Sequence, residues 1–260
     1  MISEPTHPSP YPEIRIFGIE GLPEIHPGDD IPALLFARLS STHFPIMPGD
    51  ICVVTQKIIS KAEGSLVDLR TISPSPFAQN LAARIHKDPR LLEVILRESK
   101  RIVRMDRDII ISETRHGFIC ANAGVDQSNI PGDSIVSVLP ADPDESAQKF
   151  RRGLQKYFHT EMPVIITDTF GRPWREGLTN VAVGIAGLSP LIDLRGKKDA
   201  CGYELQKTMI AVADEIASAA ELVMGKRGRI PLAVLRGYAY LKSEAGSQAL
   251  LRSPERDLFR

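Results

Sequence analysis

A run of charged and hydroxyl side chains separates two apolar segments in "PVIITDTFGRPWREGLTNVAVGIAGL", residues 163–188. Within nine positions the run holds Asp168, Thr169, Arg172, Arg175 and Glu176. The apolar "VII" predicts a central strand, and the end of that strand would deliver Thr167, Asp168 and Thr169 to the edge of a sheet, where open α/β layers usually bind ligands. A carboxylate at that edge is a hard oxygen ligand for a divalent cation.

A second carboxylate has much the same setting. In "FICANAGVDQSN" a strand-like run precedes Asp126, and Asn129 follows three residues later. Two carboxylates at two strand ends suit Mg²⁺ or Mn²⁺ that bridges nucleotide phosphates, because these ions take oxygen ligands and retain waters. The sequence does not bring the two segments together, and an Asp after a strand is most often a turn residue or a helix cap. Surface ion pairs would equally account for Arg172 and Arg175.

Composition excludes several classes of protein. Lys+Arg and Asp+Glu are both 32 in a chain of 260 residues, so no overall basic field recruits nucleic acid or an anionic membrane. No apolar run approaches the roughly 18 residues of a membrane span, and the N-terminus does not resemble a signal peptide. Cys52, Cys120 and Cys201 have no CxxC spacing, which favours reduced thiols in a cytoplasmic protein.

Motifs for common chemistries are absent from the sequence. It contains neither a Gly-rich dinucleotide fingerprint nor a GxxxxGK[ST] loop, which excludes the commonest nucleotide folds. The six histidines form no HxxxH or HExxH pair, so surface or capping roles are expected for them.

Helices and strands alternate along the chain. Helical patterns, the first of them capped by Asp30, occupy residues 29–40, 75–88, 88–101, 142–158 and 205–225, with a short helix near the C-terminus. Strands are expected in residues 13–25, 108–113, 117–125, both apolar parts of 163–188, and 230–238. In residues 50–64 a strand runs into a polar loop, and residues 193–204 form a charged loop.

Seven blocks in one order carry a resemblance to a known family. They are "GIEGLPEIHPGDD", "VVTQKIISKAEG", "ANAGVDQSN", "IITDTFGRPWREG", "VAVGIAGL", "GKKDACGYEL" and "ADEIASAAELVMG". Together they resemble the F-420-0:γ-glutamyl ligase family, whose members make the polyglutamate tail of the deazaflavin coenzyme F-420. The resemblance runs from about residue 14 to residue 240.

The resemblance implies a GTP-dependent ligase that joins L-glutamate to coenzyme F-420-0. GTP would phosphorylate the acceptor carboxylate, and the amino group of L-glutamate would attack the acyl phosphate, giving an amide, GDP and phosphate. A later glutamate would join through the γ-carboxylate of the first. The family uses Mg²⁺ or Mn²⁺, one or two ions per site, is helped by K⁺, and is generally a homodimer.

The family fold is α+β, with two domains and mixed sheets, and is neither a Rossmann, a P-loop nor an ATP-grasp fold. Four prolines among residues 1–12 indicate an extended, proline-rich arm outside the resemblance, which leaves a ligase region at 13–260. That region would contain two intertwined subdomains, roughly 13–70 with 190–260, and 71–189.

Matching positions give candidate site residues. Asp126 and Asp168 resemble the metal-binding aspartates, with Thr169 as a further ligand. Segments that resemble nucleotide contacts supply Glu20, Gly21, Leu22, Pro23, Gln56, Lys57, Lys61, Asn129, Met224, Gly225, Lys226, Arg227, Gly228 and Arg229. A cation such as Lys61 near the β- and γ-phosphates would offset the charge of phosphoryl transfer. Without the resemblance, a solvated loop lysine is the better interpretation of Lys61.

Lys226 departs from the family pattern, since some members have Glu there as a ligand of a second metal. The lysine either turns to solvent while waters and phosphate oxygens complete the shell of a second ion, which we favour, or replaces that ion's charge. We also expect Arg172 or Arg175 to act in catalysis by contacting the acceptor anion or the transferring phosphate. Two alternatives stay open: a γ-glutamyl ligase for another anionic acceptor, and a guanine-nucleotide-binding protein without catalysis.

Overall fold

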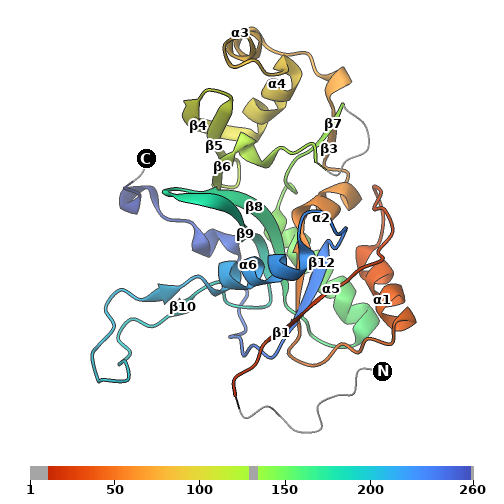
Figure 1. Ribbon diagram of the computed structural model, residues 1–260, viewed down its shortest axis with the longest axis vertical. Coiled ribbons are helices and arrows are strands. Elements are labelled where there is room, and N and C mark those ends of the chain that lie inside the picture. Colours follow the sequence, from red (N-terminus) through yellow and green to blue (C-terminus); the bar gives the residue numbers. More distant parts are fainter. Residues whose placement is uncertain (1–10, 129–133, 259–260) are drawn as a thin grey trace.

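A five-stranded mixed sheet forms the centre of the computed structural model, which describes residues 11–128 and 134–258 (Figure 1). Its strands, in spatial order, are β1 (Arg15–Gly18), β12 (Leu232–Arg236), β2 (Ile51–Thr55), β8 (Val164–Arg172) and β9 (Arg175–Ala186). Only the β2–β8 pair is parallel, and the other three pairs are antiparallel. The predicted α+β class with mixed sheets is therefore confirmed.

Helices cover both faces of this sheet (Figure 1). Side chains alternate between the faces along each strand, so Val54 of β2 packs in one core and Val53 in the other. The first core also contains residues of α1 (Ile31–Ser41) and α5 (Pro143–Phe158), and the second contains the apolar face of α6 (Val212–Met224). Burial on both faces explains the continuous apolar runs of β2 and β8.

A smaller unit lies at one end of the molecule, at the top of Figure 1. It combines two helices with a three-stranded antiparallel sheet, namely α3 (Pro76–Ile85), α4 (Pro89–Glu98), β4 (Ser99–Asp106), β5 (Ile109–Thr114) and β6 (Ile119–Ala121). A two-stranded ribbon of β3 (Leu66–Asp68) and β7 (Ile135–Ser137) lies beside α2. The 3-10 turns η1 (Leu69–Thr71) and η2 (Asn122–Gly124) contact α4. Phe118 meets Phe170 of β8 edge to face, with ring centroids 6.3 Å apart.

Capping residues start the predicted helices where the sequence indicates. Asp30 accepts a hydrogen bond from Ala33 N at 3.1 Å and starts α1. Ser75, Asp88 and Asp142 cap α3, α4 and α5 in the same way, and each is followed by a proline in the first turn.

Three local predictions are wrong. The polar loop expected after β2 is a helix, α2 (Gln56–Ala62), whose buried Ile58 and Ile59 fix it against the first core. The long helix expected at 205–225 begins only at Val212, because Met209–Ile210 forms strand β11 against β10 (Ile192–Asp193). In place of the short helix expected near the C-terminus, the chain up to residue 258 makes the 3-10 turns η3 (Ser247–Leu250) and η4 (Pro254–Arg256).

The division of residues 13–260 into two subdomains stays a prediction. Strands from both expected parts share the main sheet, since β8 and β9 lie in 71–189 and pair with β2. Of the arm at 1–12, residues 1–10 lie outside the described residues. Among the helices that the structure describes, none is both long and apolar enough to span a membrane.

Candidate active site

A cleft of about 1060 Å³ lies above the edge of the main sheet where β2 ends. Five segments form its walls: residues 22–25, the start of α2, residues 121–128, the middle of the β8–β9 hairpin, and the turn 225–231 after α6. Twelve of the predicted site residues line it, namely Leu22, Pro23, Gln56, Lys57, Lys61, Asp126, Asp168, Thr169, Gly225, Lys226, Arg227 and Arg229. These residues, most of which the resemblance implied, thus line one cleft, and their roles there stay predictions.

Asp168 reaches the cleft because β8 extends beyond the end of β2, its parallel neighbour. The last pair between β2 and β8 joins Thr55 to Thr167, and β8 then continues to Arg172 as a ribbon with β9. Asp168 is the first residue beyond that last pair. The predicted strand end at 167–169 is thus wrong, because the strand that ends there is β2.

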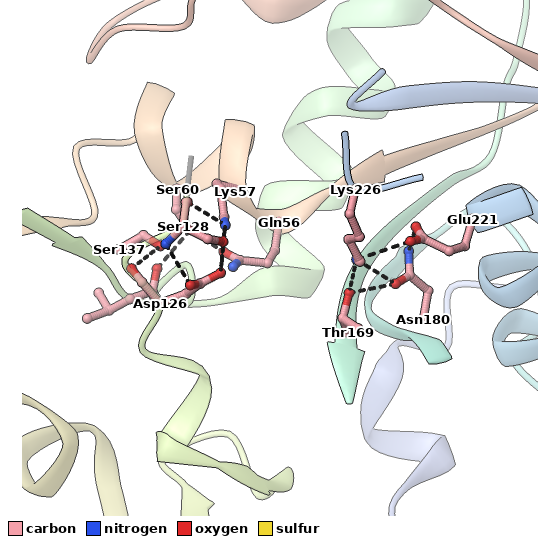
Figure 2. A network of polar contacts seen from close by, with 11 residues as sticks. Gln56, Lys57, Ser60, Asp126, Ser128, Ser137, Thr169, Asn180, Glu221 and Lys226 are labelled. Carbon is pink, nitrogen blue, oxygen red and sulfur yellow. Dashed lines mark hydrogen bonds and ion pairs between the residues drawn. The ribbon is translucent and has the colours of Figure 1, made fainter. Parts of the chain in front are cut away.

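Asp126 follows η2 and is fixed by its backbone and its side chain. Its N–H and C=O exchange hydrogen bonds with Ser137, at 3.1 and 2.9 Å. Lys57 Nζ lies 2.6 Å from its Oδ2, while the N–H of Ser128 donates to its Oδ1 at 2.8 Å (Figure 2). Burial opposes ionisation, but the bonds from Lys57 and Ser128 outweigh it and hold the pKa of Asp126 below its ordinary value.

Asp168 has the opposite electrostatic environment. Its pKa is raised to about 6, mainly by burial and also by the negative charge of Asp126, while a hydrogen bond from the Thr169 backbone acts to lower it. Both carboxylates line the same cleft. The structure therefore brings together the two aspartates that the sequence left apart.

The opposite side of the cleft carries a second polar network (Figure 2). Lys226 donates to the hydroxyl of Thr169 and lies 3.2 Å from Glu221 Oε1. Asn180, opposite Thr169 on β9, accepts from the Thr169 hydroxyl at 2.7 Å and donates from Nδ2 to Glu221 Oε2 at 2.8 Å. The network ties β8, β9 and α6 to the turn that follows α6.

Lys61 lies on α2 inside the cleft wall, with only 7% of its side chain exposed. It forms an ion pair with Glu24, and this hydrogen bond is the main reason that the pKa of Glu24 is lowered. A long cation that is buried and paired at a cleft is not a solvated loop lysine. The interpretation of Lys61 that the residues alone favoured is therefore wrong.

Several predicted residues lie away from the cleft wall. Glu20, Gly21 and Gly228 do not line it, and Met224 is buried in the second core. Arg172 and Arg175 lie at the exposed tip of the β8–β9 hairpin, so their catalytic role stays a prediction. Asn129 lies outside the described residues.

Four polar residues of the site were not predicted: Glu24, Ser128, Asn180 and Glu221. Ser128 lies within "VDQSN", and Glu24 directly follows the Leu22–Pro23 pair, so position beside predicted residues was the available signal. Glu221 precedes Lys226 by five residues, across the end of α6. No pattern in the sequence relates it to Thr169.

The donors of the cleft fit an oxygen-seeking cation. Asp126 and Asp168 present carboxylates and Thr169 a hydroxyl, and Mg²⁺ and Mn²⁺ prefer such oxygens. Within residues 11–128 and 134–258, no three His, Cys, Asp or Glu side chains form a ready-made metal cage. Mg²⁺ commonly binds through one or two carboxylates together with waters and substrate phosphates, so two aspartates that line one cleft are sufficient.

The cleft combines two carboxylates with several lysines and arginines along its walls. This combination is typical of proteins that bind anionic ligands together with a divalent cation. Residues 20–237 match the family described as F420-0:Gamma-glutamyl ligase, so the chain belongs to that family. The resemblance seen in the sequence is thereby confirmed.

Curated relatives agree over nearly the whole chain. The chain is 49% identical to the coenzyme F420:L-glutamate ligase of Methanothermobacter thermautotrophicus over 250 residues, which cover 95% of this chain and 99% of the relative. It is 46% identical to the protein of the same name from Methanopyrus kandleri, over 96% of this chain and 98% of the relative. The protein of that name from Methanocaldococcus jannaschii is 41% identical, over 95% and 97%.

Proposed function

We propose that this chain is a GTP-dependent ligase that adds L-glutamate to coenzyme F-420-0 and then extends the tail with γ-linked glutamate. Membership of the F420-0:Gamma-glutamyl ligase family and the names of the relatives support the ligase class and its two organic substrates. The observation that carries the proposal is the meeting of Asp126, Asp168 and Lys57 in one cleft.

The chain's own groups suit the binding of a triphosphate. Lys57 and Lys61 project from α2 into the cleft, and Arg227 and Arg229 line it from the turn after α6. These cations would hold phosphate oxygens and offset the charge that builds on them during transfer. Leu22 and Ile25 give the same wall an apolar part against which a base can lie.

Asp126 and Asp168 would hold Mg²⁺ or Mn²⁺, with Thr169 beside them. When bound, such an ion neutralises charge on phosphoryl oxygens. K⁺ as a further ion, and a homodimer as the working form, belong to the same proposal on the strength of the family.

The reaction needs no side-chain nucleophile. A carboxylate oxygen of the acceptor attacks the γ-phosphorus, and the bond to the GDP oxygen breaks. The amine of L-glutamate then attacks the acyl carbon, phosphate leaves, and the amine loses a proton. The protein's task is to hold the reactants in line and to exclude water from the acyl phosphate.

Mass spectrometry of the products tests the proposal. Purified protein is incubated with coenzyme F-420-0, L-glutamate, Mn²⁺ and GTP, and in parallel with ATP or without nucleotide. We expect an acceptor heavier by one or more glutamyl residues, together with GDP, only where GTP is present. GTP binding, measured separately by calorimetry, without any glutamylated product would identify a non-catalytic nucleotide-binding protein. Product formed only when another anionic acceptor replaces coenzyme F-420-0 would reassign the substrate.

A further inference from the structure

Three side-chain oxygens surround the ammonium group of Lys226. It donates to Thr169 Oγ1 and lies 3.2 Å from Glu221 Oε1 and 3.5 Å from Asn180 Oδ1 (Figure 2). The three oxygens come from β8, β9 and α6, so the assembled fold is needed to bring them together.

The positions of these oxygens are fixed by the protein and not by the lysine. Asn180 is only 2% exposed, and its Nδ2 donates to Glu221 Oε2 at 2.8 Å. With the amide nitrogen directed at the carboxylate, the amide oxygen faces the hydroxyl of Thr169 and the lysine. Ser218 Oγ also donates to the backbone oxygen of Asn180 at 2.8 Å, which ties β9 to α6.

The chemistry of this oxygen cluster favours a cation. A carboxylate, an amide oxygen and a hydroxyl are hard ligands, and together they carry one negative charge. The cluster also adjoins the C-terminal end of α6, where unpaired carbonyls favour positive charge, and the last turn of α6 contains no basic residue. Lys226 lies two residues after the end of α6, and its amino group contacts the oxygens. Its side chain remains 57% exposed.

We propose that Lys226 Nζ is a tethered cation that fills an oxygen-lined metal site formed by Thr169, Asn180 and Glu221 on the cleft wall. Without the lysine, the same three oxygens bind a divalent cation such as Mn²⁺. This site adjoins that of the Asp126 and Asp168 pair and shares Thr169 with it, but its carboxylate comes from Glu221. This proposal replaces the expectation that Lys226 turns to solvent and leaves room for a second ion.

Mn²⁺ binding to the full chain without nucleotide tests the inference. Free Mn²⁺ is measured by electron paramagnetic resonance during titration of the parent, of Lys226→Met, and of Lys226→Met combined with Glu221→Gln. Methionine retains an unbranched stem but no charge. We expect Lys226→Met to bind one Mn²⁺ more per chain than the parent, and the double variant to lose that ion again. Lys207→Met, which removes an exposed lysine outside the cleft, should match the parent.

Two results would overturn the inference. One is equal Mn²⁺ stoichiometry in the parent and in Lys226→Met, each shown to be folded by circular dichroism. The other is an anomalous Mn²⁺ peak in parent crystals at ligand distance from Thr169 Oγ1 and Glu221. The inference bears on catalysis only through the proposed ligase function. Because neither readout needs GTP or acceptor, failure of the ligase proposal would leave both results interpretable.

Discussion

Lys57 Nζ lies 2.6 Å from Asp126 Oδ2 and also contacts Ser128, so one carboxylate of the candidate metal pair is already held by a lysine. The lysine side chain is 16% exposed, which leaves the pair partly shielded from solvent. A metal ion that binds Asp126 has to share this oxygen with the ammonium or displace it. The ion pair thus couples metal affinity to the position of Lys57.

Replacing Lys57 with Met should raise Mn²⁺ affinity and lower turnover. Removal of a competing ammonium frees Asp126, and we expect Kd for Mn²⁺ without nucleotide to fall about threefold to tenfold, or roughly 1 kcal/mol. Ligation should slow because a phosphate-binding cation is lost. Lys100→Met is the matched control, since Lys100 also pairs with a carboxylate, Glu113 at 3.4 Å, but does not line the cleft. Weaker Mn²⁺ binding by Lys57→Met would show that the lysine supports the metal site instead of competing with it.

Asp168 should make the stability of the metal-free protein depend on pH. Its pKa in the fold, about 6, lies above the ordinary value of 3.8, so the folded state resists ionisation. Its contribution to stability is therefore present below pH 4 and lost as pH rises towards and through 6. Asp168→Asn should lack this loss, which is roughly 3 kcal/mol from the size of the pKa change.

Urea unfolding between pH 4 and 7, with a chelator present, measures that difference. Asp106→Asn, at an exposed aspartate outside the cleft, serves as the control. Identical pH profiles for the parent and Asp168→Asn would contradict the raised pKa.

Asn180→Ala should destabilise the fold by about 1–3 kcal/mol, because it leaves Glu221 and Thr169 without a buried hydrogen-bond partner. Urea midpoints measure the change. Asn80→Ala, on the exposed face of α3, should shift stability by no more than about 0.5 kcal/mol. Equal effects of the two substitutions would mean that the Asn180 network adds nothing to stability.

Steady-state kinetics can distinguish the roles of Arg172 and Arg175, which lie at the tip of the β8–β9 hairpin. Arg172 donates to the carbonyl oxygens of Glu176 and Gly177 within the turn, so Arg172→Ala should loosen the hairpin. Arg175→Ala should raise KM for the acceptor or lower kcat if its guanidinium reaches the anion, as we predict. If steady-state constants of both variants match the parent, neither arginine acts on the ligand.

The sequence identified the aspartates but not their meeting. That meeting depends on the parallel pairing of β2 with β8 and on the backbone bonds between Asp126 and Ser137, which are contacts between distant segments. Local sequence patterns do not show which distant segments pair. The resemblance to a known family was what placed both aspartates in one site.

Asn180 illustrates a different limit. Counting back from the Arg172–Arg175 pair would place Leu178 opposite Thr169, but an irregularity after Gly171 shifts the register by two residues. The shift places Asn180 there instead. Helix α2 was missed because seven residues are too few to display helical periodicity, so its lysines looked like loop residues.

The rate at which the Asp168→Asn variant forms glutamylated product tests whether ligation occurs in this cleft. Asparagine keeps the shape of the side chain and removes the charge that would hold the cation, so turnover at saturating Mn²⁺ should fall roughly 100-fold or more. Asp106→Asn should retain the parent rate, and circular dichroism should show all three proteins folded. A rate for Asp168→Asn close to that of the parent would contradict the assignment of this cleft as the active site.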